Sequence, residues 1–342
     1  MVLSPPQAPA PAARDDYGAG TVLARILGTT RRERRDAGWE VRFQALGTQC
    51  RWHLAGSEAN AARFTEAALR WLAGFEAKYS RFLPGSLISK INAAAGREPV
   101  ALDAETERIF ALCQELHFLT RGIFDPTSLP LLKLWNWKAN PPVIPTDAQI
   151  ESARLLVGWR QVRRTPGTVF LPQAGMGLDL GGMGKEYAVD QVSQLARQCG
   201  LTGALVDFGA DIRVFGTPPD GRTGWHIGVE DPRHPGTCWR GLAVHEASVA
   251  TSGDYHRNFE VAGVRYGHIL DPRTGRPVSN SVRAVSVLAP TCTQAGLLST
   301  SAFVLGPEEG IRLLDATAGV AGAILTDSQI HCSRRFHEHV AS

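Results

Sequence analysis

The sequence predicts an α+β fold in which one large domain combines a mixed β-sheet with flanking helices. Two observations support this class. Strand-like and helical runs alternate in the second half, where 203–216 and 283–290 are β-like and 292–306 has helical spacing. No repeat and no clear linker interrupts the chain after Trp39, although 342 residues would fit one large domain or two of ordinary size. We therefore expect a single domain.

The expected elements of the first half are a strand pair followed by helices. The run 39–56 predicts two strands broken near Gly47, and the stretch 79–96 is expected to be a loop with polar groups. Helical spacing of apolar residues predicts helices over 61–75, 103–120 and about 147–156.

The second half begins with a strand-like run at 176–180 and a glycine turn. A helix follows, because Ala188, Val192, Leu195 and Cys199 recur at helical spacing before Gly200 provides a stop signal. Two strands around a glycine turn are expected in 203–216. Further β-structure is expected at 226–233, 242–251, 283–290 and a last strand at 321–327.

Composition places the chain among globular proteins with an ample core, since 44% of its residues are hydrophobic and 20% are charged. A net charge of +3 is too small to indicate a nucleic-acid partner. Six cysteines without a close pair favour reduced thiols over a metal ribbon or a disulfide framework.

The ends of the chain are expected to be tails. Residues 1–38 are rich in Pro, Ala and Arg and predict a disordered tail, so the domain is expected to span 39–335, with a second tail at 336–342. Neither a secretory signal nor an apolar run long enough for a membrane span is found. These observations predict a cytoplasmic protein.

The segment "DLGGMGKEYAVD", residues 179–190, leads from the strand-like run into a helix N-terminus, where unpaired N–H groups favour anions. It is not a P-loop, because Asp179 and Glu186 occupy the positions of the first glycine and of the Ser or Thr. The glycines at 181, 182 and 184 also have the wrong spacing for a dinucleotide fingerprint. Taken alone, this motif is compatible with either a structural turn or a phosphate-binding site.

Polar clusters occur in four expected loops, where functional sites concentrate. Each places Asp, Ser, Thr or His beside Gly or Pro, and any one of them alone is compatible with a hydrogen-bonded turn. Their combination indicates a site. The clusters lie at 122–127, 180–185, 251–257 and 267–275.

From about Phe43 to Thr326 the chain resembles the ApbE-type FAD:protein FMN transferases, because seven sequence blocks of that family occur in the same order. The matching blocks are "LGTQC", "YSRFLPGSLISKIN", "GIFDPT", "LDLGGMGKEYAVD", "ATSGDY", "HILDPRTGRPV" and the Ser299–Thr300 pair. The resemblance implies a flavin-transferase-like α+β domain that binds FAD with Mg²⁺. It also implies transfer of FMN to a Thr or Ser hydroxyl of an acceptor flavoprotein subunit, with release of AMP.

Site residues follow from the same resemblance. His268 matches the general base, which would take a proton from the attacking hydroxyl; its alternative is a histidine in a hairpin turn. Phe82 matches a position that stacks on FAD, although a core Phe is equally compatible. The metal positions implied are Gly184 and Thr300. The cofactor-binding positions implied are Leu46, Phe82, Gly122, Asp125, Gly181, Lys185 and Leu270.

One departure from the family pattern concerns the metal. The family carries an Asp four residues before the Thr, where this chain has Gly296. A magnesium site normally includes a carboxylate, so a weakened site is expected unless Glu186 or Asp207 supplies one. The alternatives to transfer are therefore a protein that only binds FAD or FMN, and an FAD diphosphatase.

Overall fold

A nine-stranded antiparallel sheet organises the protein, whose computed structural model describes residues 17–341 except 137, 235 and 256. All eight pairings between its neighbouring strands are antiparallel. The α+β class is confirmed, but the expectation of a mixed sheet is wrong, because antiparallel pairing runs through the whole sheet. In spatial order the strands are β1 (Arg31–Arg35), β2 (Gly38–Ala45), β3 (Thr48–Ala55), β7 (Gly203–Phe208), β8 (Ile212–Gly216), β11 (Ser248–Gly253), β16 (Val282–Ala289), β17 (Ala321–Thr326) and β18 (Ile330–Cys332).

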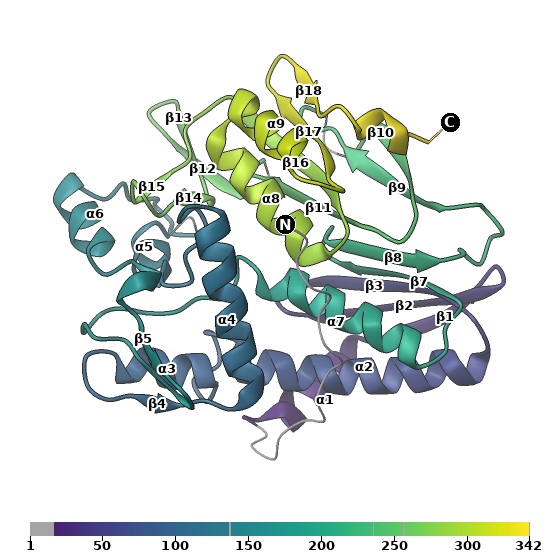
Figure 1. Ribbon diagram of the computed structural model, residues 1–342, viewed down its shortest axis with the longest axis horizontal. Helices are drawn as coiled ribbons and strands as arrows, with labels where there is room; N and C mark the ends of the chain where they lie inside the picture. The colour runs from purple at the N-terminus through teal and green to yellow at the C-terminus, as the bar shows by residue number, and fades with distance from the viewer. Residues whose placement is uncertain (1–16, 137, 235, 256, 342) are drawn as a thin grey trace.

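Helices cover one face of this sheet, and a two-stranded hairpin covers the other. Because side chains of a strand alternate between faces, Ala204 and Val206 of β7 join the core under the helices, whereas Leu205 joins the core under the hairpin. In Figure 1, α2 and α7 run along β2 and β7, and α8 and α9 lie over β16 and β17. The helices are α1 (Ala19–Thr29), α2 (Glu58–Tyr79), α3 (Leu87–Ala94), α4 (Ala104–Leu119), α5 (Leu129–Leu134), α6 (Asp147–Arg154), α7 (Gly184–Gln198), α8 (Cys292–Leu305), α9 (Pro307–Ala316) and the 3₁₀ helices η1 (Trp159–Gln161) and η2 (Phe336–His339).

The predicted helices agree with the structure except in one loop. The helices expected at 61–75, 103–120 and 147–156 correspond to α2, α4 and α6, but the expected loop 79–96 contains α3. Ser86 caps this helix by accepting a hydrogen bond from Ser89 N at 3.0 Å, a signal that polar loop composition concealed. Smaller sheets lie outside the nine-stranded sheet. The two-stranded ones pair β9 (Trp225–Glu230) with β10 (Cys238–Val244), β12 (Asn258–Val261) with β13 (Val264–Gly267), and β14 (Leu270–Asp271) with β15 (Arg276–Pro277). The three-stranded one has the order β4 (Val100–Ala101), β6 (Thr168–Phe170), β5 (Arg163–Thr165).

The N-terminal segment is folded further than predicted. Residues 1–16 of the expected tail lie outside the described residues, but α1 packs on α2 and β2, and β1 pairs along β2. Val22 and Ile26 of α1 are buried in the same core as Trp52. The predicted boundary at residue 39 is therefore wrong. The clustered arginines of β1 suggested a tail, yet charged side chains also suit a strand at the exposed edge of a sheet.

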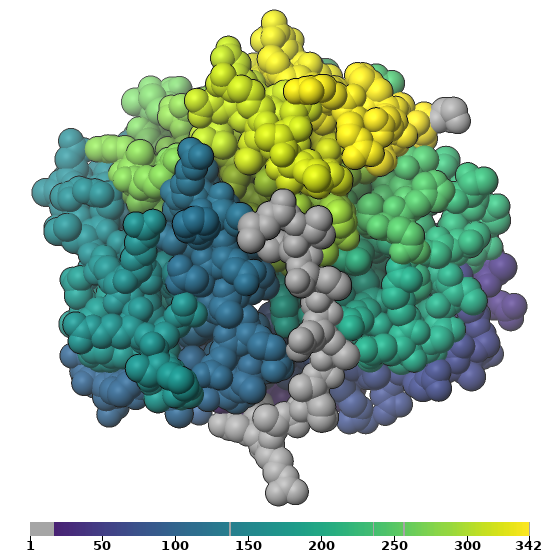
Figure 2. Space-filling model, in the orientation of Figure 1, coloured from purple at the N-terminus to yellow at the C-terminus, as the bar shows by residue number. Residues whose placement is uncertain are grey.

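The C-terminal segment is also part of the domain, contrary to the predicted tail at 336–342. Phe336 is fully buried and stacks on Trp239 with ring centroids 5.7 Å apart. Val340 forms an isolated bridge to Leu242. In Figure 2 the yellow C-terminal residues cover the top of the molecule against the green β9–β10 region. In addition, no helix within the described residues is long and apolar enough to cross a membrane.

Candidate functional site

The glycine block forms a turn that leads directly into α7. The preceding run 176–180 is not a strand, as the sequence predicted, because loops and a side chain satisfy its backbone. Leu178 N donates to Asn92 Oδ1 at 2.6 Å, and Asp179 N donates to Pro126 O at 2.8 Å. The carbonyl of Leu180 then accepts from Gly184 N at 2.7 Å, which closes the turn.

The first turn of α7 presents backbone N–H groups without a side-chain cap from Met183, the residue before it. Such an end favours an anion. Gly181 N, however, donates to Asp179 Oδ1 at 2.7 Å, so this amide organises the turn. The other oxygen of Asp179 accepts from Arg81 Nε at 2.5 Å. Contact of Gly181 with a cofactor remains a prediction.

The loop 122–127 lies against the glycine turn. The ring of Phe124 is 3.4 Å from the point where a Cβ on Gly182 would stand. Asp125 is buried and accepts hydrogen bonds from Thr127 N at 2.8 Å and Trp159 N at 3.0 Å. Its carboxylate therefore holds the loop together. Gly122 begins this loop three residues after the end of α4, with φ at 83°, a conformation that suits glycine.

Phe82 is 76% exposed, so the alternative of a core Phe is wrong. The guanidinium of Arg81 lies over its ring at 4.1 Å from the centroid. Since Arg81 also pairs with Asp179, the aromatic ring is anchored beside the glycine turn. An exposed ring at this place is available for stacking, and the stacking itself remains a prediction.

Leu46 lies in the two-residue turn between β2 and β3. Leu46 and Gly47 have φ of 53° and 73°, as a type I′ turn requires. Leu46 N donates to Glu76 Oε2 at 2.8 Å, and Arg25 Nη2 of α1 donates to Glu76 Oε1 at 2.7 Å. The N-terminal helix therefore helps to hold a predicted site residue.

Lys185, in the first turn of α7, contacts Asp211 Oδ2 and lies 3.9 Å from Glu186 Oε1. Asp211 is 4% exposed and follows the turn between β7 and β8. The ammonium group is thus shared by two carboxylates at the helix end. Asp207 in the same turn region is engaged elsewhere, because its oxygens accept from Arg51 Nη2 at 3.0 Å and Ala210 N at 2.9 Å.

Asp190 ties α7 to the beginning of α8. This carboxylate is 3% exposed and accepts from Cys292 N at 2.8 Å and Thr293 N at 2.9 Å. Arg213 Nη1 lies 2.6 Å from its Oδ1. Carboxylates suit helix N-termini, where N–H groups lack partners. Asp190 therefore fixes how the two helices align.

Glu186 lies one turn before Asp190 on α7, and Gly296 lies one turn after Cys292 on α8. The helices run in opposite directions here, so these two positions meet. A Cβ on Gly296 would stand 2.6 Å from Glu186 Cγ and 3.1 Å from Glu186 Oε1. A side chain at position 296 would force Glu186 to move from the place it occupies.

Thr300 lies one turn beyond Gly296 on α8 and is partly exposed. Its Oγ1 is 2.8 Å from Ser252 Oγ on β11, which is also 2.8 Å from Ser299 Oγ. Three hydroxyl groups therefore meet where α8 crosses the end of β11. Of the two predicted metal positions, Gly184 and Thr300, this cluster contains Thr300.

His268 follows β13 and lies close to the same end of β11. A Cβ on Gly267 would stand 2.8 Å from Asp254 Cβ, directly after β11. Burial lowers the pKa of His268 to about 4, and the charge of Arg257 acts in the same direction. The ring is thus neutral near pH 7, as a general base must be. Leu270 begins β14, and Ile269 O accepts from Val278 N at 2.9 Å.

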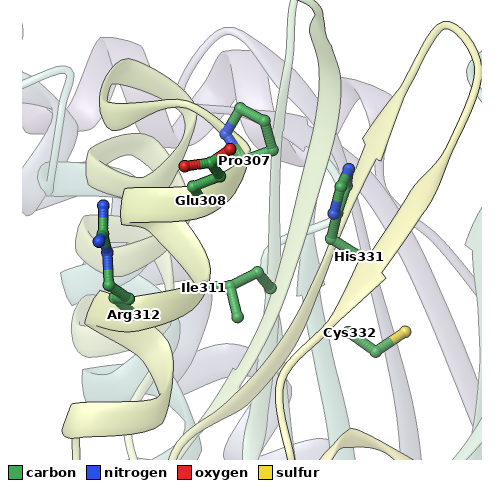
Figure 3. A pocket seen from close by; sticks show the side chains of 6 residues that line it. All are labelled: Pro307, Glu308, Ile311, Arg312, His331 and Cys332. Carbon is green, nitrogen blue, oxygen red and sulfur yellow. The ribbon is translucent and has the colours of Figure 1, made fainter.

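A shallow pocket elsewhere lies between α9 and β18. Figure 3 shows its lining by Pro307, Glu308, Ile311, Arg312, His331 and Cys332, none of which belongs to the predicted site. Within the described ranges, no group of three or more His, Cys, Asp or Glu side chains gathers to hold a metal ion.

Comparison with known protein families shows which family the chain belongs to. A family model described as the ApbE family matches residues 46–325. The chain belongs to the ApbE family. This membership confirms the family predicted from the seven sequence blocks.

Named ApbE relatives extend over most of the chain. An FAD:protein FMN transferase of Treponema pallidum is 34% identical over 313 residues, which are 84% of each chain. One of Vibrio cholerae is 33% identical over 240 residues, 69% of this chain and 72% of the relative. The crystal structure of the ApbE protein of Thermotoga maritima matches with a TM-score of 0.81 and 32% identity, over 89% of this chain and 100% of that one. The flavin transferase ApbE of Vibrio cholerae matches with a TM-score of 0.78 and 28% identity, over 88% and 99%.

Three residues that organise the candidate site were not among the predicted site residues. Asp190 aligns α7 and α8, Asp211 holds Lys185, and Arg81 joins the glycine turn to Phe82. Asp190 ends the glycine block at 179–190 and Arg81 lies within another matched block, so both were visible in the sequence. Their partners, however, are more than 90 residues away along the chain.

Proposed function

We propose that this chain is an FAD:protein FMN transferase that moves FMN from FAD to a Thr or Ser hydroxyl of an acceptor flavoprotein. The observation that supports the proposal is the contact between the start of α7 and α8, where Glu186 meets Gly296 one turn before Thr300. The uncapped start of α7 and Lys185 suit a diphosphate, and a neutral histidine and a hydroxyl cluster lie at the nearby end of β11. Membership of the ApbE family supports the same reaction.

In the proposed reaction, the acceptor hydroxyl oxygen attacks the phosphorus of the FMN half of FAD. The new phosphorus–oxygen bond forms as the bond to the bridging oxygen breaks, so AMP leaves with that oxygen. His268 accepts the hydroxyl proton, for which its neutral ring is suited. Lys185 and the N–H groups of α7 offset negative charge on the diphosphate.

We propose that the reaction uses Mg²⁺, and the oxygen atoms near the start of α7 and on α8 are of the kind that this cation binds. Magnesium prefers hard oxygen ligands and retains waters while it binds substrate phosphates. Thr300 offers a hydroxyl, Gly184 a backbone oxygen, and Glu186 Oε2 is buried without a hydrogen-bond partner among the described residues. When bound, the cation would neutralise charge developing on the diphosphate.

The test is incubation with FAD, Mg²⁺ and an acceptor flavoprotein of known competence, followed by denaturing electrophoresis and flavin fluorescence. Covalent fluorescence on the acceptor is expected. Absence of covalent flavin under varied divalent metals contradicts transfer. Free FMN and AMP formed without acceptor would identify a diphosphatase, and unchanged bound FAD would identify a binding protein.

The cytoplasmic location predicted from the sequence is a separate proposal and implies a cytoplasmic acceptor. Cell fractionation tests it directly. Recovery of the protein from the periplasm contradicts it, whatever the outcome of the transfer assay.

A further inference from the structure

Glu186 places a carboxylate inside the interface between α7 and α8. Its side chain is 12% exposed, and its Oε2 atom is buried and accepts no hydrogen bond in the part of the chain that the structure describes. A carboxylate removed from water is costly unless it is paired or binds a cation. The position of Glu186 therefore requires a physical reason.

Nearby charges do not fully balance this carboxylate. Lys185 lies 3.9 Å from Glu186 Oε1 but is in closer contact with Asp211. Arg213 is held by Asp190 at 2.6 Å. These neighbouring groups therefore comprise three carboxylates and two cations, which leaves one negative charge for a further cation.

The packing directs Glu186 to this place. Asp190 fixes the alignment of α7 with the start of α8, so that Glu186 reaches Gly296 one turn away. Gly296 offers the space because a Cβ there would stand 2.6 Å from Glu186 Cγ. Thr300, with its hydroxyl, follows one turn later on α8. The carboxylate of Glu186 therefore reaches α8 one turn before the hydroxyl of Thr300.

We propose that Glu186 is the carboxylate ligand of a divalent cation held beside the diphosphate, and that it reaches from α7 into the space left by Gly296. Asp207 is not that ligand, because Arg51 and the β7–β8 turn engage both of its oxygens. The diphosphate partner rests on the proposed function, whereas cation binding by Glu186 is tested without any transfer reaction.

The first experiment measures cation affinity. Titration of Mn²⁺ or Mg²⁺ into the protein with FAD, followed by calorimetry and by Mn²⁺ electron paramagnetic resonance, compares the wild type with E186Q. We expect E186Q to bind the cation at least about 10-fold more weakly, because it loses a charged oxygen ligand. FAD affinity without metal should not decrease, because E186Q removes a negative charge close to Lys185. D207N is the matched control and should bind the cation like the wild type.

Wild-type affinity in E186Q, or a loss in D207N instead, overturns the proposal. If E186Q does not fold by circular dichroism, E186D replaces it. Its shorter side chain keeps the charge but should still weaken cation binding, and unchanged affinity in this variant also overturns the proposal. Loss of cation binding in E186Q alongside a wild type that transfers no flavin upholds the ligand and rejects the proposed function.

Moving the carboxylate from position 186 to position 296 tests whether either position can supply the ligand to the same cation site. G296D alone should lower the melting temperature, because its Cβ overlaps Glu186. The double variant E186G/G296D removes the overlap and should regain most of the cation affinity that E186Q loses. If the folded double variant does not bind the cation, carboxylates at positions 186 and 296 do not reach the same cation site, and this part of the proposal is wrong.

Discussion

At the scale of a single residue, the proposed reaction depends most on His268. If it is the general base, His268→Ala should reduce transfer by roughly 10²–10⁴-fold while FAD affinity changes little. His245→Ala, on an exposed histidine between β10 and β11, is the matched control and should transfer flavin normally. Covalent flavin on the acceptor and fluorescence quenching of FAD measure the two quantities. Loss of FAD binding in the folded His268→Ala variant would instead make the histidine a cofactor ligand.

The pKa of His268 has a testable electrostatic cause. Burial is the larger cause of its fall to about 4, and Arg257 contributes in the same direction. Arg257→Gln should therefore raise this pKa, although not to the usual value near 6.5. Arg257→Lys keeps the charge and serves as the control. Titration of the ring by NMR measures the shift, and an unchanged midpoint in Arg257→Gln contradicts this cause.

The same shift links His268 to stability. Between about pH 4 and pH 6.5 the folded ring is neutral, whereas the unfolded ring binds a proton. The unfolded state therefore binds more protons in this window, so the contribution of His268 to stability decreases as the pH falls through it. Above pH 6.5 the contribution is constant.

At the scale of elements, the pairing of α7 with α8 depends on Asp190. Asp190→Asn should destabilise the protein by about 3–5 kcal/mol, because it leaves Arg213 without its buried partner and weakens the cap of α8. Asp220→Asn changes an exposed pair with Arg222 and should cost only about 0–1 kcal/mol. Urea unfolding compares the two variants. Equal midpoints would show that Asp190 does not join the helices.

The N-terminal helix α1 offers a matched pair of neighbouring residues. Ile26 is fully buried, whereas Leu27 is 51% exposed. Ile26→Ala should reduce the free energy of unfolding by about 2–5 kcal/mol because it leaves a cavity. Leu27→Ala should have a small effect. If both variants unfold like the wild type, α1 is not part of the core, and the boundary predicted at residue 39 would be correct after all.

Over the whole molecule, local patterns predicted the elements better than their pairing. The spacing of apolar residues identified α2, α4, α7 and α8, because one buried face repeats along a helix. The all-antiparallel pairing was not predictable, since β3 pairs with β7 across about 150 residues of chain. The folding of α1 was also missed, because its burial depends on partners in α2 and β2.

The site was predictable as a set of blocks, but its internal contacts were not. Resemblance identified the loops that meet around the glycine turn, such as 122–127 against Gly182. The roles of Asp125 and Asp211 depend on distant backbone and side-chain partners and needed the fold. The choice between Glu186 and Asp207 likewise required the contact with Gly296.

The most direct test of the transferase account is the stoichiometry of products in one turnover. FAD, Mg²⁺, the protein and a competent acceptor are mixed, and AMP, free FMN and covalently bound flavin are quantified by chromatography and intact-protein mass spectrometry. Transfer predicts one AMP for each covalent FMN on the acceptor and no free FMN. AMP accompanied by an equal amount of free FMN, or no AMP at all, would contradict the account.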